Sequence, residues 1–191
     1  MSSAMQEWPR RHRITVEHYY RMAEAGLFSQ DDRVELVNGE IIDMPPIGSR
    51  HAGTAAKLAD LLSAAIGDRA MVRTQWPVRL GDDTEVQPDL SVVRPREDYY
   101  RTAHPRAADV LLLVEISDST LRYDREVKVA LYARSGIPEV WIVDLQGEQV
   151  HFHRTPAEGR YAAQSSTGAP GEAPIGSLAG VSVDLSRLEL D

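Results

Sequence analysis

Residues 110–116 read VLLLVEI, an apolar run that is interrupted by a single acidic residue, Glu115. A continuous run of Val, Leu and Ile of this length is typical of a strand that is buried on both faces of a sheet. An ionised carboxylate is rarely fully buried without a partner, because removing it from water is costly. The residues leave two interpretations of Glu115 open: it binds a metal ion, or it forms a buried ion pair with an arginine.

The segments around this strand predict a mixed α/β fold. Helical periodicity, turn residues and apolar runs define seven successive elements. They are a helix over 49–66, strands over 71–80, 87–93 and 110–116, a helix over 124–135, and strands over 139–144 and 150–154. The order helix, strand, strand, strand, helix, strand predicts a mixed central sheet that is flanked by helices.

The N-terminal part predicts a short helix over 15–25 and then an extra hairpin. Asn38-Gly39 separates two apolar runs, and this dipeptide is a strong hairpin signal because both turn positions need a positive φ. We interpret residues 1–12 as a flexible tail and residues 13–191 as one domain. Near the C-terminus the sequence predicts a surface loop over 164–176 and an edge strand over 181–185.

Composition excludes several classes of protein. Hydrophobic residues make up 42% and charged residues 26% of the 191, which is typical of a globular chain. The absence of cysteine excludes disulfides, cysteine–zinc sites and thiol nucleophiles. The longest apolar run is too short to cross a membrane, so we expect a cytoplasmic protein without a membrane partner. The net charge of −8 argues against tight nonspecific binding to DNA and suits a pocket of carboxylates.

Two further charged residues are expected near Glu115. Pro88-Asp89 begins the strand over 87–93, which places Asp89 at the mouth of the sheet. Lys128 lies one turn into the helix that follows the strand of Glu115. An acid pair with a nearby lysine suits metal-assisted phosphodiester hydrolysis, with Mg²⁺ or Mn²⁺ as the ion that prefers such oxygen ligands. The lysine can orient or deprotonate water, or neutralise developing charge.

Five segments in order resemble one family. They are ELVNGEIIDM at 35–44, His51 at the start of a helix, QPDLSVV at 87–93, VEISDST at 114–120, and DREVKVALYARSGIPEVWIVD at 124–144. As a set they resemble the Uma2 family of the PD-(D/E)XK restriction-endonuclease-like superfamily, over roughly residues 13 to 190. The resemblance implies a restriction-endonuclease-like core and a bacterial, metal-dependent nuclease.

The resemblance also assigns roles to residues. It implies that Asp89, Glu115 and the Ile116 carbonyl bind Mg²⁺ or Mn²⁺, and that Lys128 assists the reaction. Ser117 stands where the superfamily motif has a lysine, and Lys128 matches the position to which Uma2-like proteins have moved it. We expect Ser117 to line the pocket.

Two other residues come with alternatives. Glu35 matches the family's accessory acid and is a candidate catalytic residue, but its place in a strand is equally compatible with a side chain that faces solvent. His51 is expected to line the pocket, although a lone inward histidine is more often a core or capping group.

Three hypotheses of function follow. The first is a divalent-metal-dependent endonuclease that hydrolyses phosphodiester bonds, with DNA as its substrate. The alternative is a non-catalytic, regulatory protein-interaction module that retains the nuclease fold, and the acidic net charge motivates it. A two-carboxylate glycosidase is disfavoured by an aromatic content of 6%. The resemblance also implies a homodimer, which would combine four arginines into a positive rim: Arg94, Arg96, Arg101 and Arg106.

Overall fold

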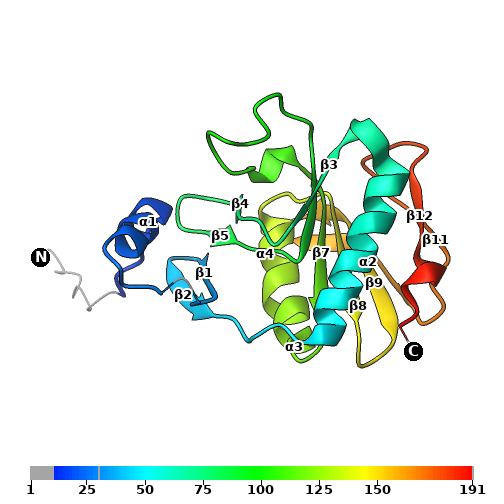
Figure 1. Ribbon diagram of the computed structural model, residues 1–191, viewed down its shortest axis with the longest axis horizontal. Helices are drawn as coiled ribbons and strands as arrows, with labels where there is room; N and C mark the ends of the chain where they lie inside the picture. The colour runs from blue at the N-terminus through cyan, green and yellow to red at the C-terminus, as the bar shows by residue number, and fades with distance from the viewer. Residues whose placement is uncertain (1–10, 30, 191) are drawn as a thin grey trace, which may run out of the picture.

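A six-stranded sheet forms the centre of the protein in the computed structural model, which describes residues 11–29 and 31–190 (Figure 1). Its strands are β3 (Met71–Thr74), β6 (Leu90–Val93), β7 (Val110–Ser117), β8 (Glu139–Asp144), β9 (Gln149–Ala157) and β10 (Arg160–Thr167). They lie in the order β10-β9-β8-β7-β6-β3. The pair β7 and β8 is parallel, and the other neighbouring pairs of this sheet are antiparallel. The predicted mixed sheet is therefore confirmed.

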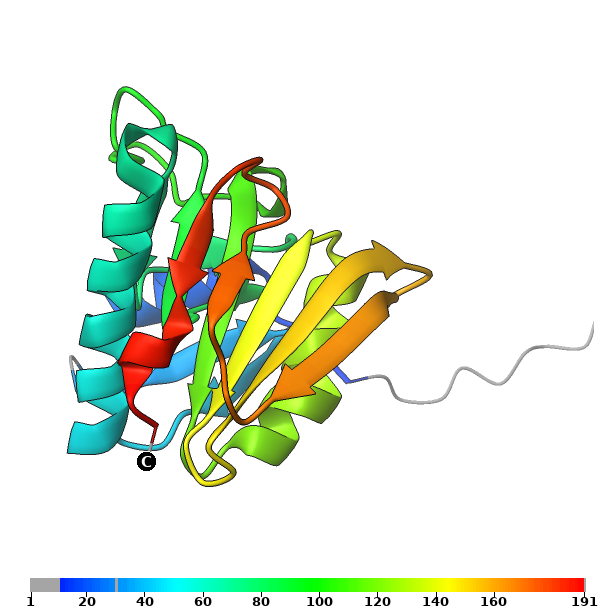
Figure 2. The same ribbon diagram turned by 90° about the vertical axis from the view of Figure 1, so that its right-hand side faces the viewer.

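Helices cover both faces of this sheet (Figure 2). On one face lies α2 (Ser49–Ile66), whose Leu58 and Leu62 are fully buried with Leu112 and Val114 of β7. On the other lies α4 (Val129–Arg134), which packs with Leu113. Side chains of β7 thus alternate between two apolar cores, as a strand that is buried on both faces requires.

A second, four-stranded sheet lies between the central sheet and α1 (Val16–Glu24) (Figure 1). Its strands are β1 (Val34–Val37), β2 (Glu40–Asp43), β4 (Val78–Arg79) and β5 (Glu85–Val86), in the order β2-β1-β5-β4. The predicted hairpin is confirmed, with φ of 50° at Asn38 and 75° at Gly39. The hairpin is half of this sheet rather than a separate appendage.

The predicted strand over 71–80 is wrong in its length, because the segment is divided between the two sheets. β3 ends at Thr74, and Gln75 takes a φ of 54° that breaks the extended backbone. Pro77, which has no N–H to donate, precedes the short β4. The next predicted strand, 87–93, similarly contributes only its last four residues, β6, to the central sheet.

The helix that follows β7 begins earlier than predicted and contains a wide turn. It runs through α3 (Leu121–Tyr123), a π-helical turn over Asp124–Lys128, and α4. A step of four residues is longer than one turn of an α-helix, so side chains four residues apart drift around the helix axis. The wider π turn compensates for this drift. Asp124, Lys128 and Tyr132, each four residues apart, are consequently buried on one face.

The C-terminal part is more regular than predicted. The expected loop over 164–176 contains the end of β10 and all of β11 (Glu172–Pro174). The expected edge strand is β12 (Ser182–Asp184), which pairs with β11 and not with the central sheet. β12 and a 3₁₀ turn at Leu185–Leu188 contact α2, and the apolar side chains of both strands belong to the same core.

The single-domain prediction for residues 13–191 stays a prediction, and most of the predicted tail, residues 1–10, lies outside the described residues. Among the described helices, none combines the length and apolar character that a membrane-spanning helix needs.

The hairpin turn provides a test of the second sheet. A Cβ on Gly39 would lie 2.6 Å from Arg13 Cβ at a φ of 75°, so Gly39→Ala should lower the free energy of unfolding by about 2–3 kcal/mol. Gly26 has the same φ but open space around it, so Gly26→Ala should cost about 1 kcal/mol. Urea denaturation of both variants measures the difference, and equal losses would show that Arg13 is not packed there.

A buried histidine predicts how stability depends on pH. His153 is 7% exposed, its ring nitrogens have no hydrogen-bond partner among the described residues, and burial lowers its pKa to about 4. Between about pH 6.5 and 4 the unfolded chain binds more protons at this residue, so stability is lost as pH falls through that window. His153→Phe should reduce this loss by roughly 2 kcal/mol, measured by denaturation at pH 7 and pH 4.5. An unchanged slope would contradict the assignment.

Candidate active site

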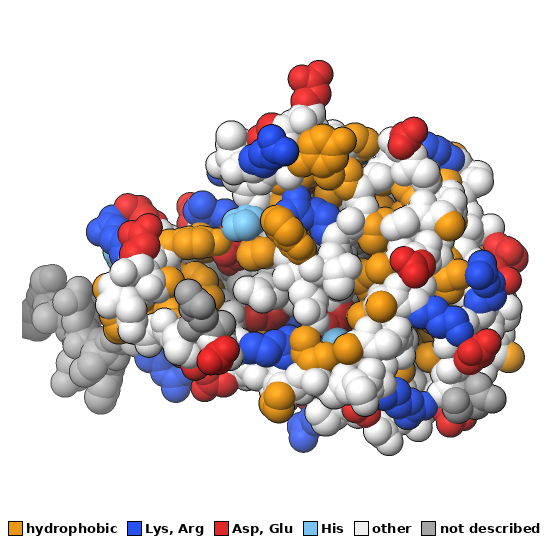
Figure 3. Space-filling view, in the orientation of Figure 1, with side chains coloured by type: hydrophobic (Ala, Val, Ile, Leu, Met, Phe, Trp, Pro, Cys, Tyr) orange, Lys and Arg blue, Asp and Glu red, His pale blue; other side chains and the backbone are white. Residues whose placement is uncertain are grey.

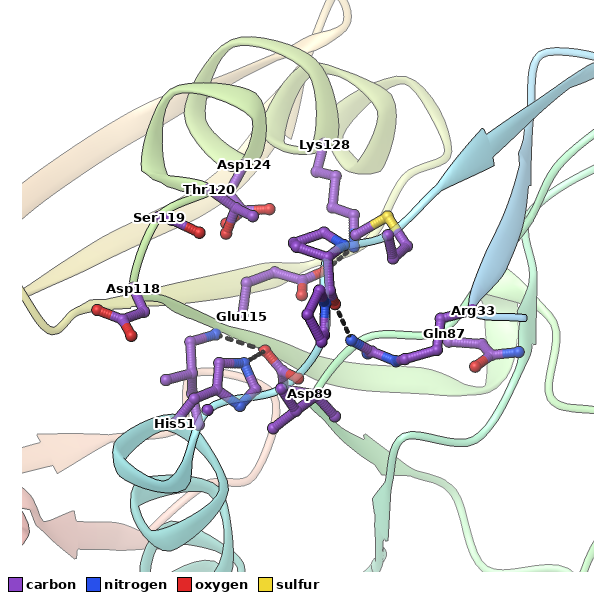
Figure 4. A pocket seen from close by; sticks show the side chains of 16 residues that line it. Arg33, His51, Gln87, Asp89, Glu115, Asp118, Ser119, Thr120, Asp124 and Lys128 are labelled. Atoms are coloured by element: carbon purple, nitrogen blue, oxygen red, sulfur yellow. Dashed lines mark hydrogen bonds and ion pairs between the residues drawn. The ribbon is translucent and has the colours of Figure 1, made fainter. Parts of the chain in front are cut away.

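A pocket opens where β6 begins and β7 ends, beside the N-terminus of α2 and the helix that begins at α3 (Figure 4). Asp89, Glu115, Asp124 and Lys128 line it with polar groups, and residues 44–48 form an apolar wall. The face of the molecule in Figure 3 shows acidic atoms inside a hollow.

Asp89 occupies a position where the strand ladder stops. The register pairs Leu90 with Val114, and beyond this pair the backbone N–H of Ile116 donates to Asp89 Oδ2 at 2.8 Å. His51 Nε2 lies 3.0 Å from the same oxygen. The other oxygen, Oδ1, has a long contact of 3.5 Å with Gln75 Nε2. One oxygen of Asp89 is therefore fixed, while the second is available at the pocket.

Glu115, Lys128 and Glu35 form a buried cluster of charges. Lys128 Nζ lies 3.2 Å from Glu115 Oε1 and 3.1 Å from Glu35 Oε1. The three side chains are between 2% and 5% exposed. Tyr132 donates its hydroxyl to Glu115 Oε1, and the N–H of Gln87 donates to Glu35 Oε1 at 2.8 Å. Glu115 therefore forms a buried ion pair, as the second of the two interpretations expected. Its partner is a lysine, Lys128, rather than an arginine.

Burial and charge act on this cluster in opposite directions. Burial raises the pKa of Glu115, although the positive charge of Lys128 opposes the shift. Burial lowers the pKa of Lys128, but Glu115, Glu35 and Asp124 outweigh it and raise the pKa overall. Lys128 is therefore an ammonium ion at neutral pH. The hydrogen bond to Asp89 raises the pKa of His51.

Comparison with known proteins assigns the family. A model of the Uma2 family, described as "Putative restriction endonuclease", matches residues 16–186. The chain belongs to the Uma2 family. A search of curated proteins finds none that matches.

A solved structure shows the same fold. It is the crystal structure described as a "putative nuclease belonging to DUF820 from Anabaena variabilis ATCC 29413". The likeness has a TM-score of 0.68 at 17% identity and covers 92% of this chain and 97% of that chain. The fold and the family expected from the sequence are confirmed.

The candidate site residues that were identified from the sequence lie together at this pocket or directly behind it, except Ser117. Asp89, Glu115, Ile116, Lys128 and His51 line the pocket. Glu35 faces the inside of the molecule, behind Lys128, and not the solvent. The expectation that Ser117 lines the pocket is wrong. It is fully buried, and its hydroxyl donates to Asp124 Oδ2 at 2.7 Å.

Asp124 and Tyr132 are site residues that the sequence interpretation missed. Asp124 lines the pocket, accepts from Ser117 and Thr120, and has its pKa raised by burial. Tyr132 holds Glu115 from behind. Both lie four residues from Lys128, and this spacing was the available signal. It was hidden because the prediction of a helix over 124–135 assumes a regular α-helix, whereas the structure has a π turn over Asp124–Lys128.

The chain can offer oxygen ligands to a cation here. In the described part of the chain, no group of three His, Cys, Asp or Glu side chains is arranged as a metal cluster. Mg²⁺ needs less, because it usually keeps several waters and takes one or two carboxylates. Asp89 Oδ1 lacks a strong partner, and both partners of Glu115 contact its Oε1, which leaves Oε2 without a hydrogen bond among the described residues. The donor set therefore fits a hard divalent ion.

The charge cluster predicts the effect of removing its cation. Lys128→Met leaves two buried carboxylates without a counter-ion, so the free energy of unfolding should fall by about 3–5 kcal/mol. The chain's other lysine is a matched control, because Lys57 pairs with Glu189 on the surface and Lys57→Met should cost less than about 1 kcal/mol. Denaturant titration tests both, and adding Glu35→Gln and Glu115→Gln to Lys128→Met should restore part of the loss. Similar losses for the two lysines would contradict the cluster.

Proposed function

We propose that this Uma2 protein is a divalent-metal-dependent endonuclease that hydrolyses phosphodiester bonds in DNA. The observation that carries the proposal is the buried ammonium of Lys128 paired with Glu115, in a pocket that Asp89 also lines. In each carboxylate the protein binds one oxygen strongly and not the other. Membership of a family described as "Putative restriction endonuclease" supports the same reaction class.

Asp89, Glu115 and the Ile116 carbonyl are the residues that would hold Mg²⁺ or Mn²⁺. N–H and C=O of one strand residue point to the same neighbouring strand, so the Ile116 carbonyl shares the open edge where its N–H meets Asp89. When bound, such an ion supplies positive charge to the scissile phosphate and activates the attacking water.

The residues of the chain supply orientation and charge. Lys128 acts as a fixed ammonium that stabilises charge developing on the phosphate, because its raised pKa makes it a poor general base. Glu35 and Tyr132 position Lys128 and Glu115 from the buried side. His51 orients Asp89 through its 3.0 Å contact. We propose that Glu35 acts as an accessory acid by holding the ammonium of Lys128 in position. It does not contact the substrate itself.

Cleavage of DNA tests the proposal. The native chain should cut plasmid DNA and labelled oligonucleotides with Mg²⁺ or Mn²⁺ and not with EDTA. Asp89→Ala and Lys128→Ala should each reduce the rate by at least about 100-fold, the scale expected for one electrostatic group. Asp60→Ala, which removes an exposed carboxylate from α2, is the control and should cleave normally. Circular dichroism must show folded variants, and equal rates in all chains would refute the assignment.

The non-catalytic module remains the second candidate, because the net charge of −8 opposes binding of an extended phosphate backbone. Calorimetric titration with Mn²⁺ separates the two. A folded chain that binds no ion at millimolar concentration would favour the module. The homodimer and the cytoplasmic location stay predictions.

A further inference from the structure

Trp76 is a large aromatic side chain that is exposed close to the pocket. It is 53% exposed and lies in the segment that crosses from β3 to β4 (Figure 1). The preceding residue, Gln75, donates its backbone N–H to the carbonyl of Asp89 at 3.0 Å, and its side chain reaches Asp89 Oδ1. Trp76 is therefore one residue away from a direct contact with the candidate catalytic carboxylate.

An arginine holds the Trp76 ring in place. Arg73 Cζ lies 4.4 Å from the centroid of Trp76 and 5.3 Å from that of Tyr100, and Arg96 covers Tyr100 at 4.3 Å. Stacking uses the faces of the guanidinium and leaves its in-plane N–H groups free to donate. Pro77 restricts the backbone of Trp76 as well. The ring is thus exposed, with a cation against one face and a restricted backbone.

The charge of Arg73 has no counter-ion in the described part of the chain. Arg73 is 8% exposed, yet no hydrogen bond or ion pair to its guanidinium is found among the described residues. Its guanidinium packs against aromatic rings and not against a carboxylate, so its positive charge is not neutralised by a described residue. An anion that arrives from outside, such as a phosphate, would compensate this charge.

The strand register places Arg73 on the same face of the sheet as the catalytic pair. Arg73 pairs with Ser91 and Ser91 with Leu113, so the next position on this face brings Asp89 level with Glu115. Two residues along a strand span roughly 7 Å. In Figure 3, hydrophobic and basic side chains gather beside the hollow that contains acidic atoms.

We infer that Trp76 and Arg73 form a nucleotide subsite, in which an unpaired base stacks on Trp76 and its phosphate pairs with Arg73. The subsite rests on the proposed function and narrows its substrate to single-stranded DNA. Bases inside a duplex stack on one another, so they present a face to the ring only after the cost of leaving the stack. Stacking on aromatic rings together with arginine contacts is how single strands are bound without reading sequence. Such local binding also needs less basic surface than a duplex does, which suits the net charge of −8.

Binding of a fluorescein-labelled single-stranded oligonucleotide in EDTA tests the subsite without cleavage. By fluorescence anisotropy, Trp76→Ala should raise Kd roughly 5- to 150-fold, and Trp76→Phe should restore most of the affinity. Arg73→Gln should reduce the slope of log K against log salt by about 0.7, the value for one phosphate of a single strand, whereas Trp76→Ala should leave the slope unchanged. Arg160→Ala and Leu27→Ala, at exposed positions outside the subsite, are controls that should bind as the native chain does.

The outcomes separate the subsite from the endonuclease. If native protein binds the single strand more weakly than a duplex of the same sequence, or if Trp76→Ala binds normally, the subsite is refuted even where DNA is cut. If Trp76→Ala weakens binding as expected and no chain cuts DNA with Mg²⁺ or Mn²⁺, the subsite stands and the endonuclease fails. Arg73→Gln is judged only by its slope at equal fold content, measured by circular dichroism, so a general loss of stability does not mimic the result.

Discussion

Lys128 is the residue on which the arrangement of the two sheets depends. Its ammonium is buried between Glu35, which belongs to the second sheet, and Glu115, which belongs to the central one. Each carboxylate alone would be expensive to bury, and so would the ammonium, because the cost of losing water is recovered only when all three are together. The helix must therefore place the ammonium of Lys128 between Glu35 and Glu115, which fixes both the position of Lys128 along the helix and its direction around the helix axis. The π turn over Asp124–Lys128 sets both.

The pocket exists because backbone pairing between β6 and β7 stops at the pair Leu90 and Val114, before it reaches Asp89. Where the next strand residue would pair, the side chain of Asp89 accepts the N–H of Ile116 instead. A side chain thus satisfies a backbone donor that would otherwise be left without a partner, and the sheet opens without an energetic penalty for that group. The hydrogen bond from the Ile116 N–H fixes one oxygen of Asp89 and leaves its other oxygen at the opening of the pocket.

Much of this could be predicted from local sequence. The apolar run of β7, the periodicity of α2 and Asn38-Gly39 each encode their structure within a few residues, and these predictions are confirmed. The division of 71–80 between two sheets depends on partners that are distant in sequence, so periodicity could not show it. The π turn over Asp124–Lys128 was not predicted for a related reason, because the segment over 124–135 is interpreted from its sequence as a regular α-helix. Ser117 was misplaced because Asp124, which takes its hydroxyl, enters the pocket through that turn.

The position of Glu35 has a consequence for how this protein loses its structure. One carboxylate of the charge cluster moves with each sheet, so the sheets cannot separate without exposing a charge in a space that had excluded solvent. Docking of the sheets and assembly of the pocket are therefore one cooperative event. A partly folded chain with a separate central sheet would have no organised pocket at all.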